Sequence, residues 1–185
     1  MKPCVFRPLR LSLAAGCAWA WVLAALALEP GSAWGAGEGV ARDVITARVI
    51  RVRDGDSLLV RTRGRDVEVR LADVDAPERG QPHADAARKA LIGLLQRREV
   101  TLDVLDTDPY RRKVARVHRL PDGLDINAEV VRAGHAWVYR RYVRDESLFE
   151  LEKAARERRA GLWGLPEKQR TPPWEYRRAE RLESR

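Results

Sequence analysis

Cysteine is almost absent from the 185-residue sequence, and the only two, Cys4 and Cys17, lie near the amino terminus. The rest of the chain therefore cannot form a disulfide, even in an oxidising compartment. The three histidines, His83, His118 and His135, do not share the spacing of a metal site, so we assign them surface or packing roles. With neither disulfides nor bound zinc to support it, the domain must be stabilised by its hydrophobic core.

Charge is missing from Leu11–Leu28, a run of 18 residues. Basic residues precede this run, and small residues with one glutamate follow it, which is the layout of a secretory signal peptide. We predict a signal peptide over residues 1–36, with the cleaved bond left open, and hence a secreted or periplasmic protein. Two alternatives remain. Eighteen apolar residues can just span a bilayer, which would give an uncleaved anchor with the domain outside the cytoplasm, and "AAGC" ending at Cys17 is a possible lipoprotein site.

The chain carries a formal net charge of +8. Removing residues 1–36 takes away three basic residues and one acidic residue, which leaves about +6. A positive field of this size favours polyanions, either nucleic acid or an anionic membrane face. Nothing in the sequence implies a stable protein partner, and we expect a monomer.

The apolar residues predict a mainly β domain with helices. Alternation of apolar and polar residues predicts five strands, over residues 44–52, 57–63, 66–71, 99–106 and 112–120. Helical spacing predicts three helices, over residues 81–98, 127–134 and 145–161. A closed barrel leaves no sheet edge exposed, so we predict a five-stranded OB-fold barrel (α+β) over residues 44–165. Residues 166–185 are expected to form a polar, flexible tail, in which "PPWEY" docks on the domain.

Three acidic residues, Asp73, Asp75 and Glu78, lie within six positions of this basic chain. Like charges this close repel one another, and the cost rises on burial unless a cation lies among them. If the first three strands pair as a meander, Asp56 lies near Asp75. Two carboxylates, a backbone carbonyl and waters form an all-oxygen site for a hard cation such as Ca²⁺. The pattern therefore predicts a calcium site, the alternative being that "DGD" at residues 54–56 is only a polar turn.

The segments "VRDGDSLLV", "VRLADVDAPE" and "DPYRRKVA", in this order and spacing, resemble the staphylococcal nuclease (thermonuclease) family. "NAEVVRAGHAWVY" and "GLWG" resemble it too, so the resemblance covers residues 44–165. It implies an OB-fold nuclease that uses Ca²⁺ to hydrolyse phosphodiester bonds in DNA and RNA, leaving 3′-phosphate ends.

The resemblance also implies roles for individual residues. The calcium ligands are the side chains of Asp56 and Asp75 and the carbonyl of Ala76; Arg70 and Arg112 bind phosphate; Glu78 activates or orients the attacking water. Phosphodiester hydrolysis needs such parts: an in-line water, neutralised transition-state charge and a metal that polarises the phosphoryl oxygens. A guanidinium binds phosphate oxygens bidentately, which lysine cannot do, and single donors of this kind are commonly worth about 10² to 10³ in rate.

One loop departs from the family pattern, which usually reads basic residue, Tyr, Gly, Arg. Here Arg111 stands in place of the glycine. If that position needs a positive φ, the loop must be rearranged, so both Arg111 and Arg112 stay open as the phosphate-binding residue. Tyr110 is a candidate for contact with a substrate phosphate or base, the alternative being a half-buried tyrosine at a strand end.

Two functions remain to be compared. The first is an exported, Ca²⁺-dependent nuclease that acts on DNA, RNA or both with little sequence specificity. The second is a catalytically silent OB-fold module that binds nucleic acid or a protein partner. All five expected charged positions are occupied, at Asp56, Arg70, Asp75, Glu78 and Arg112. A silent module has no need of all five, so the sequence favours the nuclease.

Overall fold

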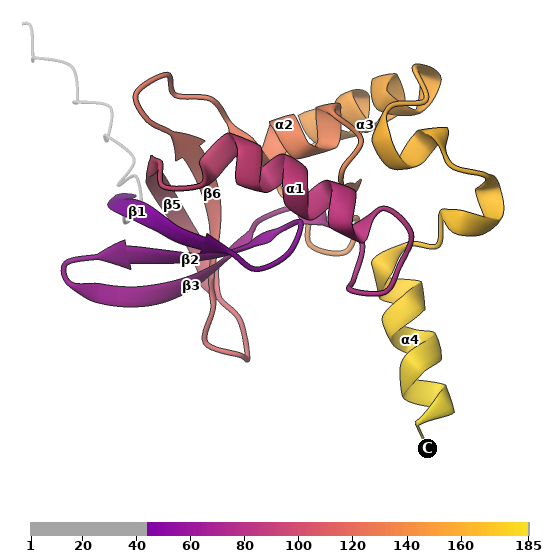
Figure 1. Ribbon diagram of the computed structural model, residues 1–185, viewed down its shortest axis with the longest axis horizontal. Helices are drawn as coiled ribbons and strands as arrows, with labels where there is room; N and C mark the ends of the chain where they lie inside the picture. Colours follow the sequence, from indigo (N-terminus) through magenta and orange to yellow (C-terminus); the bar gives the residue numbers. More distant parts are fainter. Residues whose placement is uncertain (1–43, 185) are drawn as a thin grey trace, which may run out of the picture. The chain divides into compact units, whose positions relative to one another are not determined.

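The computed structural model describes residues 44–184, and the predicted signal peptide lies outside the described residues. Five strands close into a barrel in the order β1-β2-β3-β6-β5 (Figure 1). They are β1 (Val44–Val52), β2 (Ser57–Thr62), β3 (Arg65–Leu71), β5 (Glu99–Thr107) and β6 (Lys113–Arg119). The first three form the antiparallel meander expected from the sequence; β6 then closes the barrel by pairing parallel to β3 and antiparallel to β5. The predicted five-stranded OB-fold barrel with helices is confirmed.

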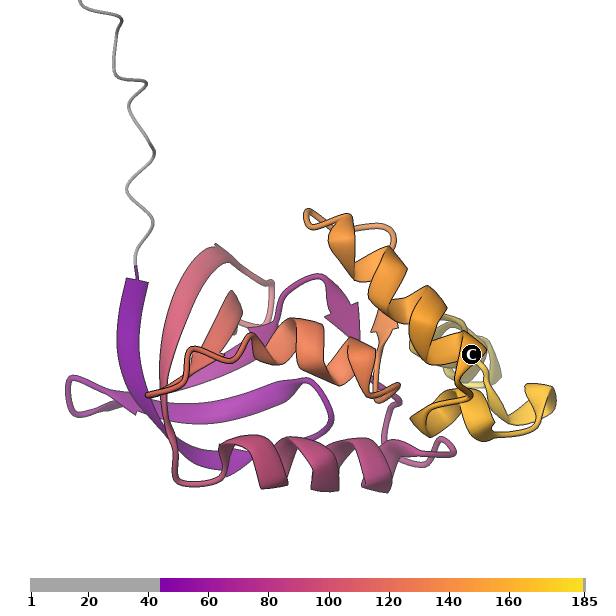
Figure 2. The same cartoon turned by 90° about the horizontal axis from the view of Figure 1, so that it is seen from above.

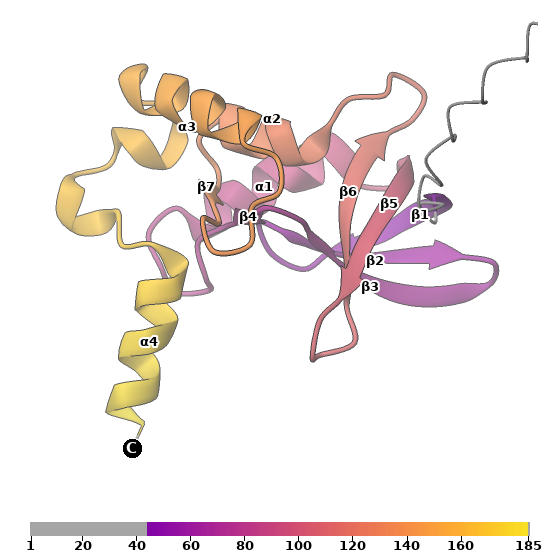
Figure 3. The same ribbon diagram turned by 180° about the vertical axis from the view of Figure 1, so that it is seen from behind.

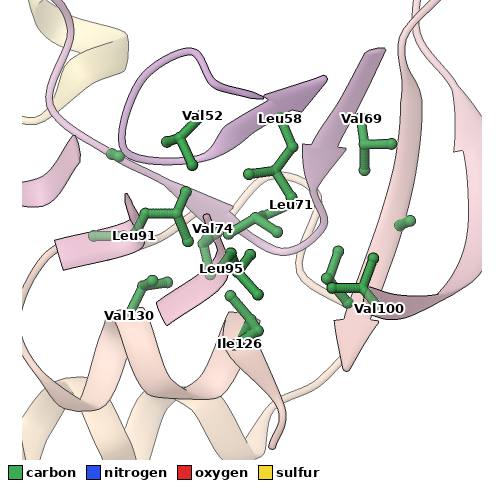
Figure 4. Packing of buried hydrophobic residues seen from close by; sticks show 14 of the residues in the cluster. Val52, Leu58, Val69, Leu71, Val74, Leu91, Leu95, Val100, Ile126 and Val130 are labelled. Atoms are coloured by element: carbon green, nitrogen blue, oxygen red, sulfur yellow. The ribbon is translucent and has the colours of Figure 1, made fainter. Parts of the chain in front are cut away.

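Three helices cover the barrel where the sequence placed them: α1 (Ala84–Leu95), α2 (Ile126–Arg132) and α3 (Ser147–Glu157). In Figure 2, α1 and α2 lie along the barrel, with α3 beyond α2. Their apolar faces meet the barrel interior in one core, part of which Figure 4 shows; its members include Val52, Leu58, Val69, Leu71, Leu91, Leu95, Val100, Ile126 and Val130. Each such side chain contributes about 1.5–3 kcal/mol when fully buried. This core fixes the strand ends that carry the site.

A second, two-stranded sheet lies at the end of the barrel and pairs β4 (Val74–Asp75) with β7 (Trp137–Val138). Strands of two residues are too short to show a period of two, so the sequence did not predict them. The buried carboxylate of Glu152 in α3 accepts a hydrogen bond from the amide of Val138 at 3.1 Å. Helix α3 thereby supports β7, which in turn holds Asp75 in β4.

The buried amide of Asn127 in α2 ties the barrel to the segment that follows β3. Its Oδ1 accepts a hydrogen bond from the amide of Val117 at 3.0 Å, and its Nδ2 donates to the carbonyls of Ala72 at 2.9 Å and Ala115 at 3.2 Å. A buried side chain with all these partners satisfied fixes the relative positions of the three segments. The hydrogen bond from Asn127 to Ala72 thus holds the turn that leads into β4.

The segment after Pro166 differs in secondary structure from the expected polar tail. A short 3-10 helix, η1 (Gly161–Gly164), precedes this segment. The segment itself contains a second short 3-10 helix, η2 (Glu167–Gln169), followed by helix α4 (Pro173–Glu183). Proline suits the first turn of a helix, and Pro173 is buried there. The Trp174 ring stacks on Tyr139, with centroids 5.7 Å apart and planes 8° apart, so the "PPWEY" segment does contact the domain. Figures 1 and 3 show α4 projecting from the same side of the barrel as the β5–β6 loop.

None of the helices among residues 44–184 combines the length and the apolar character that crossing a bilayer demands.

Candidate active site

Asp56 lies in the turn between β1 and β2, with its carboxylate buried. Its Oδ2 accepts a hydrogen bond from the amide of Ala76 at 2.9 Å, and its Oδ1 accepts one from the Ser57 hydroxyl at 2.8 Å. The turn packs so tightly that a Cβ on Gly55 would lie 2.6 Å from the Cβ of Ala76 and 3.0 Å from that of Ala87. The glycine of the "DGD" motif is therefore needed for close packing, and the motif is more than a polar turn.

Arg70 joins the two aspartates. The register of β2 with β3 pairs Ser57 with Arg70, which brings the end of β3 beside Asp56. The Arg70 Nη2 lies 3.3 Å from Oδ2 of Asp56 and 2.5 Å from Oδ1 of Asp75. Both carboxylates thus face one point, as the meander predicted, and the Arg70 side chain is only 16% exposed.

Burial and charge act in opposite directions on these two carboxylates. Burial alone would raise the pKa of Asp56, but the charge of Arg70 and the hydrogen bonds from Ala76 and Ser57 hold this pKa below its usual value. Burial raises the pKa of Asp75 despite its arginine partners, because its side chain is 0% exposed. Ionised Asp75 is therefore the costly member of the pair and the one that most needs a cation.

A second cation reaches these carboxylates from α4. The Arg177 guanidinium donates to Oδ2 of Asp75 at 2.7 Å and to Oδ1 at 3.1 Å, and it also forms an ion pair with Glu78. This contact spans 102 positions of the chain. The pKa of Arg177, already high, is raised further: burial works against it, but Asp75 and Glu78 outweigh burial, so the group stays charged. Sequence reasoning missed Arg177 because nothing in the "PPWEYRRAERLE" segment marks one of its three arginines as inward-facing.

Asp73, the third acid of the cluster, belongs to a different contact. It adopts a left-handed φ of 65° in the turn before β4, and its carboxylate accepts a hydrogen bond from the amide of Arg144 at 2.9 Å. Its other oxygen lies 3.5 Å from the Arg116 guanidinium. The repulsion expected among the three acids is thus relieved by separate arginines on each side of the turn, and Asp73 serves the geometry of the turn.

Arg112 lies in the β5–β6 loop, where Asp108 holds it. The two oxygens of Asp108 accept hydrogen bonds from the Arg112 Nε at 2.7 Å and from the amides of Arg112 and Tyr110, both at 2.9 Å. These contacts hold the pKa of Asp108 below its usual value, overcoming the opposite effect of burial. The Arg112 guanidinium also lies over the Tyr110 ring, 5.6 Å from its centroid. Tyr110 itself is 81% exposed, so the alternative of a half-buried strand-end ring is wrong.

Arg111 adopts a φ of 67°, the left-handed conformation that glycine tolerates best. The loop therefore keeps its turn without glycine, at a cost of about 1–2 kcal/mol for a non-glycine residue. Arg111 is exposed and does not line the groove described below, whereas Arg112 does. The turn thus distinguishes the two candidate phosphate-binding arginines, since it places Arg112 in the groove and Arg111 outside it.

A groove of about 910 Å³ connects these features. Its walls include Asp56, Arg70, Ala76 and Glu78 from the barrel end, Tyr110 and Arg112 from the β5–β6 loop, and Arg177 from α4. Asp75, which is fully buried, and Arg111, which is exposed, do not line it. The groove presents guanidinium groups on two sides and carboxylates at its base, which suits an anionic chain held against a small cation.

The donor set at the base of the groove fits a hard cation. Oxygens of Asp56 and Asp75 both contact the Arg70 guanidinium, and the amide of Ala76 donates to Asp56, so the three residues offered as ligands are neighbours. No group of three or more His, Cys, Asp or Glu side chains is arranged for a metal anywhere in residues 44–184. An ion here would depend on two carboxylates, a carbonyl and waters, which is characteristic of weak oxygen sites for Ca²⁺.

The sequence is similar to a nuclease family model and to several curated proteins, and two of those described below carry nuclease names. A family model described as "Staphylococcal nuclease homologue" matches residues 68–164. The micrococcal nuclease of Shigella flexneri is 40% identical over 142 residues, covering 72% of this chain and 80% of that protein. Protein ParB of Escherichia coli is 39% identical over 143 residues with the same coverage. A protein of Escherichia coli O157:H7 named an uncharacterized endonuclease is 37% identical over 133 residues, covering 72% of this chain and 85% of its own. Helix α4 lies beyond the part that the family model matches.

Proposed function

The chain belongs to the staphylococcal nuclease family, and we propose that it is an exported, Ca²⁺-dependent nuclease that cleaves phosphodiester bonds in DNA, RNA or both, with little sequence specificity. Family membership supports nuclease activity on nucleic acid. The finer proposals are calcium dependence, 3′-phosphate ends and export. The observation that supports calcium dependence furthest is the bridge formed by Arg70 between Asp56 and Asp75, with Glu78 linked to Asp75 through Arg177.

We assign Asp56, Asp75 and the carbonyl of Ala76 as the residues that hold Ca²⁺. When bound, the ion polarises a phosphoryl oxygen and neutralises charge on the phosphate. Arg70, fixed by two carboxylates, is oriented before substrate arrives and loses little entropy on binding phosphate.

Arg112 is the second phosphate-binding residue. Asp108 occupies its Nε, and its two terminal amino groups form no hydrogen bond within residues 44–184, so both are available to phosphate oxygens. Arg111 lies outside the groove and is not needed for this role. Tyr110, exposed beside Arg112, is in position to contact a phosphate or stack on a base.

Glu78 is the residue that accepts a proton from, or orients, the attacking water. Its backbone amide donates to the side chain of Gln81 at 2.7 Å, which fixes the turn after Ala76. Its carboxylate is paired with Arg177, whose guanidinium occupies an oxygen that a water molecule would need to contact. The proposal therefore requires the contact between Arg177 and Glu78 to loosen when substrate binds.

The test is cleavage of a single-stranded DNA by the purified protein in Ca²⁺ and in excess EGTA, followed by analysis of the ends. We expect cleavage only with Ca²⁺ and 3′ ends that can be extended only after phosphatase treatment. Full activity in EGTA would contradict the calcium assignment, and binding without cleavage would indicate the silent OB-fold module. Export is tested separately, by the mass of the protein recovered outside the cytoplasm.

A matched pair of variants tests the guanidinium requirement. Arg70→Lys keeps the charge but removes bidentate binding, and is expected to lower kcat by about 10²-fold or more. Arg61→Lys is the control, because Arg61 also pairs with an aspartate, Asp66 at 2.7 Å, but does so on the exposed barrel surface. Equal losses in the two variants would mean that Arg70 acts only through the stability of the barrel.

A further inference from the structure

Helix α4 separates its charges by face. Trp174, Arg177, Arg178 and Arg181 follow one another at intervals of three, one and three residues, so they share one side of the helix. The glutamates at 175, 180 and 183 fall outside this series. We refer to these four residues as the arginine face of α4.

A cavity of about 530 Å³ runs along the arginine face. It is lined by Tyr139, Arg140, Arg141, Trp174, Arg177, Arg178 and Arg181, with no carboxylate among them. Tyr139, Arg141, Arg177 and Arg181 also line the 910 Å³ groove, so the two spaces adjoin. The cavity therefore extends from the candidate active site along α4, and every charged side chain that lines it is an arginine.

Three of the five arginines that line this cavity lack acidic partners within residues 44–184, whereas Arg140 pairs with Glu152 and Arg177 with Asp75 and Glu78. Arg141, Arg178 and Arg181 form no ion pair with any residue between 44 and 184, and Arg178 and Arg181 are exposed. The stacking of Trp174 on Tyr139 and the hydrogen bond from Gln81 Nε2 to the carbonyl of Thr171 at 2.9 Å hold α4 in place. Like charges fixed close together repel one another, and an anion that contacts several of them relieves this cost.

We propose that the arginine face of α4 binds the sugar-phosphate backbone of the substrate strand beyond the bond that is cleaved. This inference rests on the proposed function, because it takes the 910 Å³ groove as the cleavage site. Arg178 and Arg181 lie one helical turn apart and each offers a planar fork of donors that fits a phosphate group. The result is a longer binding site than the barrel alone provides, contributed by a segment outside the matched family model.

The test measures binding and does not depend on cleavage. A labelled single-stranded 20-mer DNA is titrated with the purified protein in EGTA at a series of NaCl concentrations, for the wild type and for the double variant Arg178→Gln/Arg181→Gln. Each phosphate contact on a single strand contributes about 0.7 to the slope of log K against log[salt]. Loss of two contacts should reduce the slope by about 1.4, which corresponds to about 25-fold weaker binding at 0.1 M salt.

Arg48→Gln/Arg65→Gln is the control, because it removes the same charge from exposed positions in β1 and at the start of β3, neither of which lines the groove or the cavity along α4. An equal reduction of the slope in both double variants, or no reduction in either, would overturn the proposal. So would a result in which the α4 variant loses binding to phosphatidylglycerol vesicles but keeps the wild-type slope on DNA, since the face would then serve a membrane. A protein that cleaves no substrate would contradict the proposed function, yet the slopes would still report on α4.

Discussion

Replacing Arg177 with methionine tests how this protein balances the buried charge of Asp75. Methionine keeps much of the volume of the side chain but removes both hydrogen bonds to Asp75 and the ion pair with Glu78. Among residues 44–184, Asp75 would then retain Arg70 as its only cationic partner. If Ca²⁺ uses the same carboxylate, Arg177 and the ion compete for it.

The size of the effect follows from burial. Removing one partner of a buried ion pair costs about 3–5 kcal/mol. The Arg177 side chain is 27% exposed, so solvent screening reduces the cost below this range, and we expect a loss of about 2–3 kcal/mol in EGTA. For a domain of this size that loss lowers Tm by about 4–12 °C. The same free energy becomes available to a calcium ion, so the variant should bind Ca²⁺ about 30- to 150-fold more tightly than the wild type.

The assay combines thermal unfolding in EGTA and in Ca²⁺ with calorimetric titration of the ion. Arg178→Met is the matched control, since it removes the same charge from the neighbouring, exposed residue and so reports the general effect of net charge. The expected pattern is a lower Tm in EGTA, a larger increase in Tm with Ca²⁺, and tighter Ca²⁺ binding, all specific to Arg177→Met. A folded variant whose calcium affinity is unchanged or weaker would show that the guanidinium and the ion do not share Asp75.

Three further predictions concern catalysis, the β5–β6 loop and pH. Glu78→Gln should lower kcat by about 10²-fold or more while changing nucleotide affinity less than about tenfold, as measured by single-turnover cleavage and by titration; equal losses in both would argue against a role in activating water. Asp108→Asn should raise KM and destabilise the fold by about 1 kcal/mol, because it weakens the hydrogen bonds that hold Arg112; unchanged KM would mean that the loop is oriented without them. Burial lowers the pKa of both His83 and His135, whose ring nitrogens lie 2.9 Å apart, and the charge of His135 lowers that of His83 further. The unfolded chain therefore binds more protons below about pH 6.5, so the free energy of unfolding should fall as the pH decreases through that region, by up to about 1.4 kcal/mol per pH unit for each histidine. Replacing both with phenylalanine should flatten this dependence in denaturant titrations between about pH 5.5 and 7; an unchanged slope would contradict the assignment.

Much of the barrel and of the site was predictable because the relevant signals are local. Alternation of apolar residues marked the strands, and the first hairpin fixed the register that brings Asp56 toward the end of β3. The short connection from β3 then places Asp75 within reach of Arg70. The sequence also raised the positive φ at Arg111, because this residue stands where the family pattern has glycine, and a positive φ is a property of one residue and its turn.

The sequence by itself determined the barrel, its helices and the acidic base of the groove, because strand period, turn residues and neighbouring positions depend on contacts between residues near one another in the chain. Only the tertiary structure decided that Asp73 pairs away from Asp75, and that Arg177 joins Arg70 as a cationic partner of Asp75. That contact depends on the packing of Trp174 against Tyr139, which aims one face of a highly charged helix at the groove. A pairing across 102 positions leaves no periodic trace in the sequence, so it becomes visible only once the chain is folded.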